Sequence, residues 1–288
     1  MNIPHFRSAF RAWRTHAVAT VVLAAAAIVP LSLSTAGSAA AQDSQHGAAK
    51  PTIVLIHGAW ADASSWTKVI TRLQNDGYTV VAPANPLRSV AGDAAFVRAF
   101  LQTLSGPVVL VGHSYGGFVI TNAATGLPNI KALVYVNAFA PDQGETAFAL
   151  AGADSALAAD PTTVFDFVPA TLPPTGSTEL YLKKSTVFNS FAPELSRQEK
   201  TIVWATQRSG PISALNEPSG APAWRTIPSW YLIGTNDKII PAGSQRAMAQ
   251  RAGSVVTEYD AGHLGLITDP KTVTRGIERA AVATAHAG

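Results

Sequence analysis

The chain of 288 residues is predicted to fold as one α/β domain built on a mostly parallel, doubly wound sheet. The first observation is that continuous apolar runs, typical of strands buried on both faces, alternate along the chain with segments in which apolar residues have helical spacing. The second is composition: 47% of the residues are hydrophobic and 14% are charged, which suits one large core. Alternating strands and helices of this kind form doubly wound sheets with helices on both faces.

Residues 1–41 have the pattern of a secretory signal peptide. Three arginines precede an apolar run at 17–29, and small residues at 39–41 supply a cleavage site. About thirteen apolar residues are too few to span a bilayer, so the alternative of a membrane anchor is disfavoured. We therefore expect export to the periplasm or the medium, with residues 42–51 as a flexible lead-in to the domain.

Charge and cysteine content exclude several classes of function. The formal net charge is +3, but residues 1–41 hold three of the 21 basic residues and no acidic ones, which leaves 18 basic and 18 acidic residues. No cluster of lysine and arginine remains, so nothing predicts binding to nucleic acid or stable membrane insertion after cleavage. The absence of cysteine excludes disulfides, thiolate metal sites and a cysteine nucleophile. No pattern indicates the oligomeric state.

The elements follow from these periodicities in chain order. The first helix, for example, places Trp66, Val69 and Leu73 on one face. The predicted strands are 52–57, 79–84, 107–111, 132–139, 229–234 and 254–260. The predicted helices are 66–75, 93–104, a segment through 118–124, 244–251 and one from about 270.

Residues 141–222 interrupt this alternation. The segment is rich in proline, alanine, serine and threonine and has scattered aromatics but no strand-like runs. We expect a mostly helical cap inserted into the domain of residues 52–288, over the edge of the sheet where α/β proteins bind ligands. Its inward-facing apolar side chains should help to form a substrate pocket. The candidate pocket residues are Trp60, Phe148, Phe188, Phe191 and Leu264.

A serine stands between a buried strand and a helix. Residues 112–116 read Gly-His-Ser-Tyr-Gly and fit the G-x-S-x-G pattern, in which a sharp turn lifts the serine Oγ clear of the sheet. Gly112 and Gly116 are the small neighbours that let strand and helix approach. The alternative is an ordinary glycine-rich loop, but the strand–turn–helix context favours Ser114 as a nucleophile.

A serine nucleophile needs a base, and elimination points to one of the seven histidines. His5 and His16 lie in the predicted signal peptide, His46 lies in the lead-in, and His286 is third from the C-terminus. His113 in the turn is expected to point away from the Ser114 Oγ, and His57 to shape the loop after the first strand. His263, in the loop after the last predicted strand, remains as the base.

The base in turn needs an acid to orient it. Asp237 follows the strand 229–234 by three residues, and Asp142, after the preceding strand, is its competitor. Asp237 could instead be a turn or cap residue, but the order Ser114, Asp237, His263 is that of α/β-hydrolases. An acyl-transfer site also needs amide donors for an oxyanion, here the N–H of Tyr115 and one from the loop at Gly58.

From Thr52 onward the chain resembles α/β-hydrolases. The stretches "IVLIHGAW", "VAPANPL", "GHSYGG" and "GTNDKIIP" are similar to the branch that holds EstC-like esterases, plant methylesterases and hydroxynitrile lyases. The resemblance implies an α/β-hydrolase fold with about six strands, because no hairpin precedes Thr52. It also implies the triad in the same roles, with Ala59 and Tyr115 supplying the oxyanion amides.

The leading functional hypothesis is a serine carboxylesterase that acts on small to medium esters, aromatic ones included, without a cofactor or metal. The alternatives are a lipase, a hydroxynitrile lyase, a haloperoxidase-like perhydrolase or a non-catalytic binding protein. Related lyases carry threonine where this chain has Gly58 and lysine where it has Leu264, and both departures favour hydrolysis. A binding protein is disfavoured because no triad member is missing.

Overall fold

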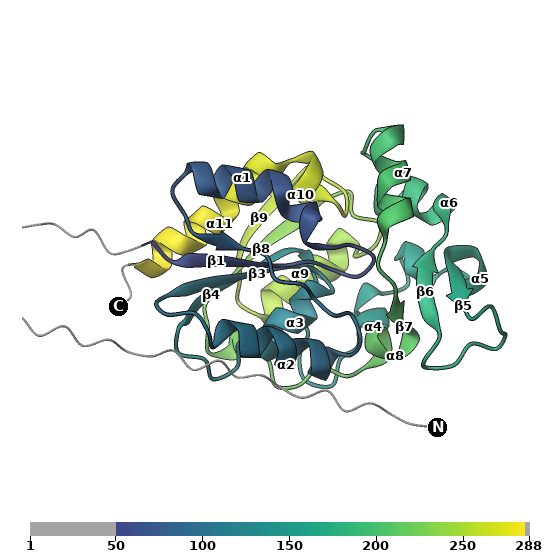
Figure 1. Cartoon of the computed structure of the whole chain (residues 1–288), viewed down its shortest axis with the longest axis horizontal. Helices are drawn as coiled ribbons and strands as arrows, with labels where there is room; N and C mark the ends of the chain where they lie inside the picture. Colours follow the sequence, from purple (N-terminus) through teal and green to yellow (C-terminus); the bar gives the residue numbers. More distant parts are fainter. Residues whose placement is uncertain (1–49, 286–288) are drawn as a thin grey trace, which may run out of the picture. The chain divides into compact units, whose positions relative to one another are not determined.

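The computed structural model describes residues 50–285, which belong to one compact unit (Figure 1). The predicted leader and nearly all of the predicted lead-in lie outside these residues. The central sheet has six strands in the order β2-β1-β3-β4-β8-β9, and every neighbouring pair is parallel. The strands are β1 (Thr52–Ile56), β2 (Val80–Val81), β3 (Val108–Ser114), β4 (Ile130–Ala138), β8 (Ser229–Gly234) and β9 (Val255–Tyr259). This confirms the predicted doubly wound sheet.

Helices cover both faces of the sheet (Figure 1). On one face, α1 packs against α10 and α11; on the other, α2 packs against α3, and α9 packs on β8. The helices are α1 (Thr67–Asn75), α2 (Val90–Leu101), α3 (Gly116–Ala123), α9 (Ala242–Arg251), α10 (Gly265–Thr268) and α11 (Pro270–Ala285). Helix α2 begins earlier than predicted because Ser89 caps it, accepting a hydrogen bond from the Gly92 N–H at 3.0 Å.

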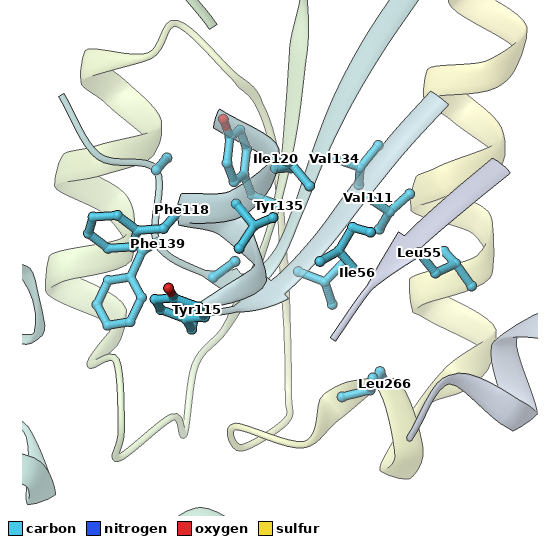
Figure 2. Close-up of a cluster of buried hydrophobic side chains, with 14 of the residues drawn as sticks. Leu55, Ile56, Val111, Tyr115, Phe118, Ile120, Val134, Tyr135, Phe139 and Leu266 are labelled. Carbon is cyan, nitrogen blue, oxygen red and sulfur yellow. The ribbon is translucent and has the colours of Figure 1, made fainter. Parts of the chain in front are cut away.

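The core is formed by the central strands and the helices on either side. All seven residues of β3 are buried, as the apolar run predicted. Figure 2 shows Phe118 and Ile120 of α3 on one side of these strands and Leu266 of α10 on the other. Burial on both faces explains why these strands read as continuous apolar runs. It also makes them a rigid support for the loops at their carboxyl ends.

The segment between β4 and β8 forms the cap, at the end of the sheet where the parallel strands finish (Figure 1). Helical residues outnumber strand residues in it, but it also contains a three-stranded antiparallel sheet, which corrects the expectation that the segment lacks strands. The two longer of these strands have four residues each, too few for a clear periodic signal. The cap strands are β5 (Phe165–Val168), β6 (Glu179–Leu182) and β7 (Gly210–Pro211).

The cap helices are short apart from α7. They are α4 (Ala147–Ala151), η2 (Ala156–Ala158), α5 (Pro161–Val164), α6 (Lys184–Thr186), η3 (Val187–Phe191), α7 (Arg197–Thr206), α8 (Ile212–Asn216) and η4 (Ala223–Arg225). Within residues 50–285, no helix has the length and apolar character needed to cross a bilayer.

Candidate active site

Ser114 is the last residue of β3, is separated from α3 by Tyr115 alone, and has a backbone φ of +53°. This left-handed conformation is uncommon for a residue with a side chain, and it produces the sharp turn between strand and helix. Both flanking glycines are required. A Cβ at Gly112 would lie 2.7 Å from the Gly116 oxygen, and one at Gly116 would lie 2.5 Å from the Ile56 oxygen. The structure therefore gives Ser114 the elbow geometry that the sequence predicted.

His263 and Asp237 form a buried pair on neighbouring loops. Asp237 follows β8 and His263 follows β9, and because these strands are adjacent and parallel, their following loops meet. The Nδ1 atom of His263 lies 2.9 Å from Oδ2 and 3.1 Å from Oδ1 of Asp237. Neither side chain is exposed to solvent. The other ring nitrogen, Nε2, is buried and has no hydrogen-bond partner among residues 50–285.

The Asp237 carboxylate is held by four further donors. Its Oδ1 accepts from the backbone N–H groups of Ile239 at 2.8 Å and Ile240 at 2.9 Å. Its Oδ2 accepts from Gln245 Nε2 at 3.0 Å and Asn137 Nδ2 at 3.2 Å. These bonds fix the plane of the carboxylate that faces the imidazole.

Sequence reasoning missed Asn137 and Gln245. Asn137 is the last residue but one of β4 and has a φ of +44°. It also donates to the Gly262 oxygen at 3.1 Å, in the loop that carries His263. A polar residue in the apolar run 132–139 was a detectable signal for it. Gln245 lies in α9, and a glutamine in a predicted amphipathic helix is ordinarily a surface residue. Nothing in its local sequence marks it as buried.

The competitor Asp142 lies in a different environment. Its Oδ1 accepts from Arg225 Nη2 at 2.6 Å, in an ion pair whose two side chains are partly exposed. A hydrogen bond from the Gln143 backbone, together with Arg225, lowers the pKa of Asp142. The structure thus pairs Asp142 with Arg225 and pairs Asp237 with the histidine.

The other two buried histidines hold loops. His57 Nδ1 lies 2.9 Å from the Gly58 oxygen, and its Nε2 accepts from the Asn85 N–H at 3.1 Å. His113 Nε2 lies 2.9 Å from the His263 oxygen, which ties the elbow to the loop that carries His263. Burial lowers the pKa of both His57 and His113, so both are neutral at pH 7. These contacts match the structural roles expected for them.

The loop after β1 lies against Ser114. A Cβ built on Gly58 would be 2.6 Å from the Ser114 Cβ and 3.2 Å from its Oγ, so only glycine fits there. Ala59 and Tyr115 line the same small cavity as Ser114. Tyr115 is anchored through its hydroxyl, which donates to Asp93 Oδ2 at 3.0 Å, and burial raises its pKa. The predicted oxyanion residues are therefore neighbours of the serine.

Three of the cavities around these residues include four of the five predicted pocket residues. The cavity at Ser114 has a volume of only about 10 Å³ and is bordered by Trp60 and Phe148. A second, of about 190 Å³, is lined in part by Trp60, Phe191 and Leu264. A third, of about 410 Å³, is lined in part by Phe148. Phe188 lines none of the three and instead lies beneath the ammonium groups of two lysines.

The site contains no obvious place for a metal. Among residues 50–285, no group of three or more histidine or acidic side chains is arranged to hold an ion. The chemistry available is that of a hydroxyl at a strained turn, a histidine that contacts His113 in this turn and has one free buried nitrogen, and a buried carboxylate that orients this histidine. Such a set suits proton transfer coupled to attack by an oxygen nucleophile.

Comparisons with known proteins agree with this architecture. A model of the alpha/beta hydrolase family matches residues 53–275. The chain is 26% identical over 269 residues to the alpha/beta hydrolase nvfD of Aspergillus novofumigatus, covering 81% of this chain and 97% of the fungal protein. It is 33% identical over 110 residues to a carbendazim hydrolyzing esterase from a Nocardioides species, covering 34% of this chain and 46% of that protein.

Among solved structures, an extracellular alpha/beta-hydrolase from a Paenibacillus species superimposes with a TM-score of 0.68 at 24% identity. The match covers 80% of this chain and 99% of the Paenibacillus chain. At this level of identity the likeness is one of fold.

Proposed function

Because the chain belongs to the alpha/beta hydrolase family, we propose that it is a serine carboxylesterase in which Ser114, His263 and Asp237 form the catalytic triad. The observation that carries this proposal is the buried His263–Asp237 pair, since its one free nitrogen, Nε2, is the atom that a base at the elbow serine requires. The similarity to an esterase over 110 residues supports the choice of ester as the bond that is cleaved.

The proposed reaction has two steps. His263 Nε2 takes the proton of the Ser114 hydroxyl while Oγ attacks the ester carbonyl, and the imidazolium then gives this proton to the departing alcohol. The resulting acyl-enzyme is hydrolysed by a water molecule that His263 deprotonates in the same way. Asp237 keeps the Nδ1 proton in place and stabilises the imidazolium. The backbone N–H groups of Ala59 and Tyr115 receive the negative oxygen of each tetrahedral intermediate.

Two residues favour hydrolysis over cyanohydrin cleavage. Leu264 follows the base, is buried and carries no charge, so it offers no ammonium to a departing cyanide. Gly58 carries no hydroxyl, and its contact with Ser114 leaves no space for a threonine.

The test is a panel of p-nitrophenyl esters and a cyanohydrin, each assayed with the wild-type protein and with Ser114→Ala. We expect ester hydrolysis that falls by about three or more orders of magnitude in the folded variant, and no cyanide release. Cyanide release by the wild type without ester hydrolysis would replace the proposal by a lyase. Unchanged hydrolysis in Ser114→Ala would refute the mechanism.

A further inference from the structure

The largest cavity at the cap is apolar and uncharged. It has a volume of about 410 Å³, is partly open to solvent and is bordered by α4, η2, α5, β5, β6 and α8. No lysine, arginine, aspartate, glutamate or histidine lines it. Its main side chains are Phe148, Leu157, Phe165, Phe167, Leu180 and Ile212. A space of this size and lining is suited to a compact hydrophobic group, whereas a charge placed there would lose its hydration without a partner.

This cavity adjoins the space at Ser114. Phe148 and Leu157 line both. The space at Ser114, of about 10 Å³, is close to the minimum for one water molecule, so a substrate enters only if a wall moves. Of the ten residues that line this space, nine are buried and Phe148 is half-buried. It stands on the five-residue helix α4, and its ring makes an edge contact with Phe165 at a centroid distance of 6.4 Å.

From this arrangement we propose that the apolar cap cavity binds the larger, uncharged half of the ester and that Phe148 is the gate between this cavity and Ser114. The inference rests on the proposed esterase function and adds the substrate class to it. Phe148 is a specificity-determining residue in this account, because movement of its ring joins the two spaces.

The second cavity, of about 190 Å³, is acidic, whereas the first is uncharged. Asp62 and Glu199 both line it. Burial opposes ionisation of Asp62, but hydrogen bonds from Ser64 outweigh it and lower the pKa of this carboxyl. Hydrogen bonds from Ser196 lower the pKa of Glu199. Both are therefore ionised at pH 7. Glu199 is paired with Lys68 at 3.9 Å, so Asp62 is the charge that disfavours a carboxylate in this cavity, whereas a neutral or cationic group is admitted.

Trp60 separates the two cavities. Its Nε1–H donates to the Leu180 oxygen at 2.9 Å. The centroid of its ring lies 5.8 Å from that of Phe165 and 6.2 Å from that of Phe191. Phe191, which borders the acidic cavity, also lies 5.2 Å from the His263 ring, so this one side chain contacts both the cavity and the proposed base. The expected substrate is thus an ester with one bulky apolar half and one small half, and with no negative charge on either.

The gate is tested with ethyl acetate and two bulky isomers, cyclohexyl acetate and methyl cyclohexanecarboxylate. Phe148→Ala should raise kcat/KM for at least one bulky isomer relative to ethyl acetate by about tenfold or more, and Phe148→Trp should lower the same ratio. The control is Phe96→Ala, since Phe96 is an exposed phenylalanine of α2 and should leave the ratio unchanged. If neither Phe148 variant moves the ratio for either isomer, Phe148 is not a gate.

The cavity is tested separately from catalysis. The Ser114→Ala protein is titrated with the neutral fluorophore N-phenyl-1-naphthylamine, with and without Ile212→Asp, which places a carboxylate in the half-buried cavity wall. We expect Ile212→Asp to raise the Kd about tenfold or more. An unchanged Kd would overturn the assignment of the cavity. The failure of the esterase function would show differently, as wild-type protein that hydrolyses none of the three esters.

Discussion

Replacement of Asp237 by asparagine gives a sharp prediction because the hydrogen bonds around the carboxylate determine where the amide nitrogen must go. At Oδ1 the nitrogen would face the backbone donors of Ile239 and Ile240, which cannot turn away. It should therefore take the Oδ2 position, 2.9 Å from Nδ1 of His263. A donor at that position forces Nδ1 to accept, so the ring proton moves to Nε2, which can then no longer take a proton from Ser114.

The expected result is a loss of kcat of about 10⁴-fold in Asp237→Asn, the size seen when an aspartate of a serine triad is replaced and the histidine adopts the wrong tautomer. The assay is p-nitrophenyl acetate hydrolysis at pH 7.5, with folding checked by circular dichroism. The matched control is Asp142→Asn, which removes only a partly exposed ion pair with Arg225 and should change kcat by less than about twofold. A larger loss in Asp142→Asn than in Asp237→Asn would refute the assignment.

Three further predictions concern other parts of the molecule. Gly58→Thr should lower kcat/KM about 100-fold or more and destabilise the fold, because the threonine Cβ would overlap the Ser114 side chain. Steady-state kinetics measure the first effect and urea denaturation the second, and a fully active variant would contradict the close contact. The free energy of unfolding should fall from pH 7 to pH 5, since burial lowers the pKa of His57 and His113 and the unfolded chain binds protons there that the folded chain does not. Urea titrations across this range check the sign, and a rise in stability on acidification would be inconsistent with it. Exported protein should begin near Gln42 by N-terminal sequencing, whereas membrane-bound protein that retains Met1 would identify the apolar run as an anchor.

The elements that carry the site were predictable because each has a local signal. The elbow at Ser114 shows as small residues between an apolar run and helical spacing, and Asp237 and His263 each follow a strand-like run. In a parallel sheet the carboxyl ends of all strands share one edge, so residues that follow strands meet there. This logic gave the sheet and the order of the candidate triad.

The residues that surround and hold the candidate triad were harder to predict, because their positions depend on contacts between segments that are distant in the sequence. Gln245 is eight residues from Asp237 in the chain but reaches it only because α9 packs on β8. The cap strands were missed because each pair depends on a neighbour outside its own short segment. Phe188 illustrates the same limit, since aromatic residues in a cap can face a cavity or a lysine and the local sequence does not distinguish the two.

The central claim, that Ser114 is the nucleophile, is tested most directly by covalent labelling. Diethyl p-nitrophenyl phosphate phosphorylates an activated serine, and mass spectrometry of a tryptic digest locates the label. The peptide of residues 99–131, between Arg98 and Lys131, contains Ser114. We expect one diethyl phosphate per chain on Ser114, with activity lost in proportion to labelling. Ser114→Ala should take up no label, and Asp237→Asn should be labelled at a much lower rate. Stoichiometric labelling of a different residue, accompanied by the same loss of activity, would contradict the account.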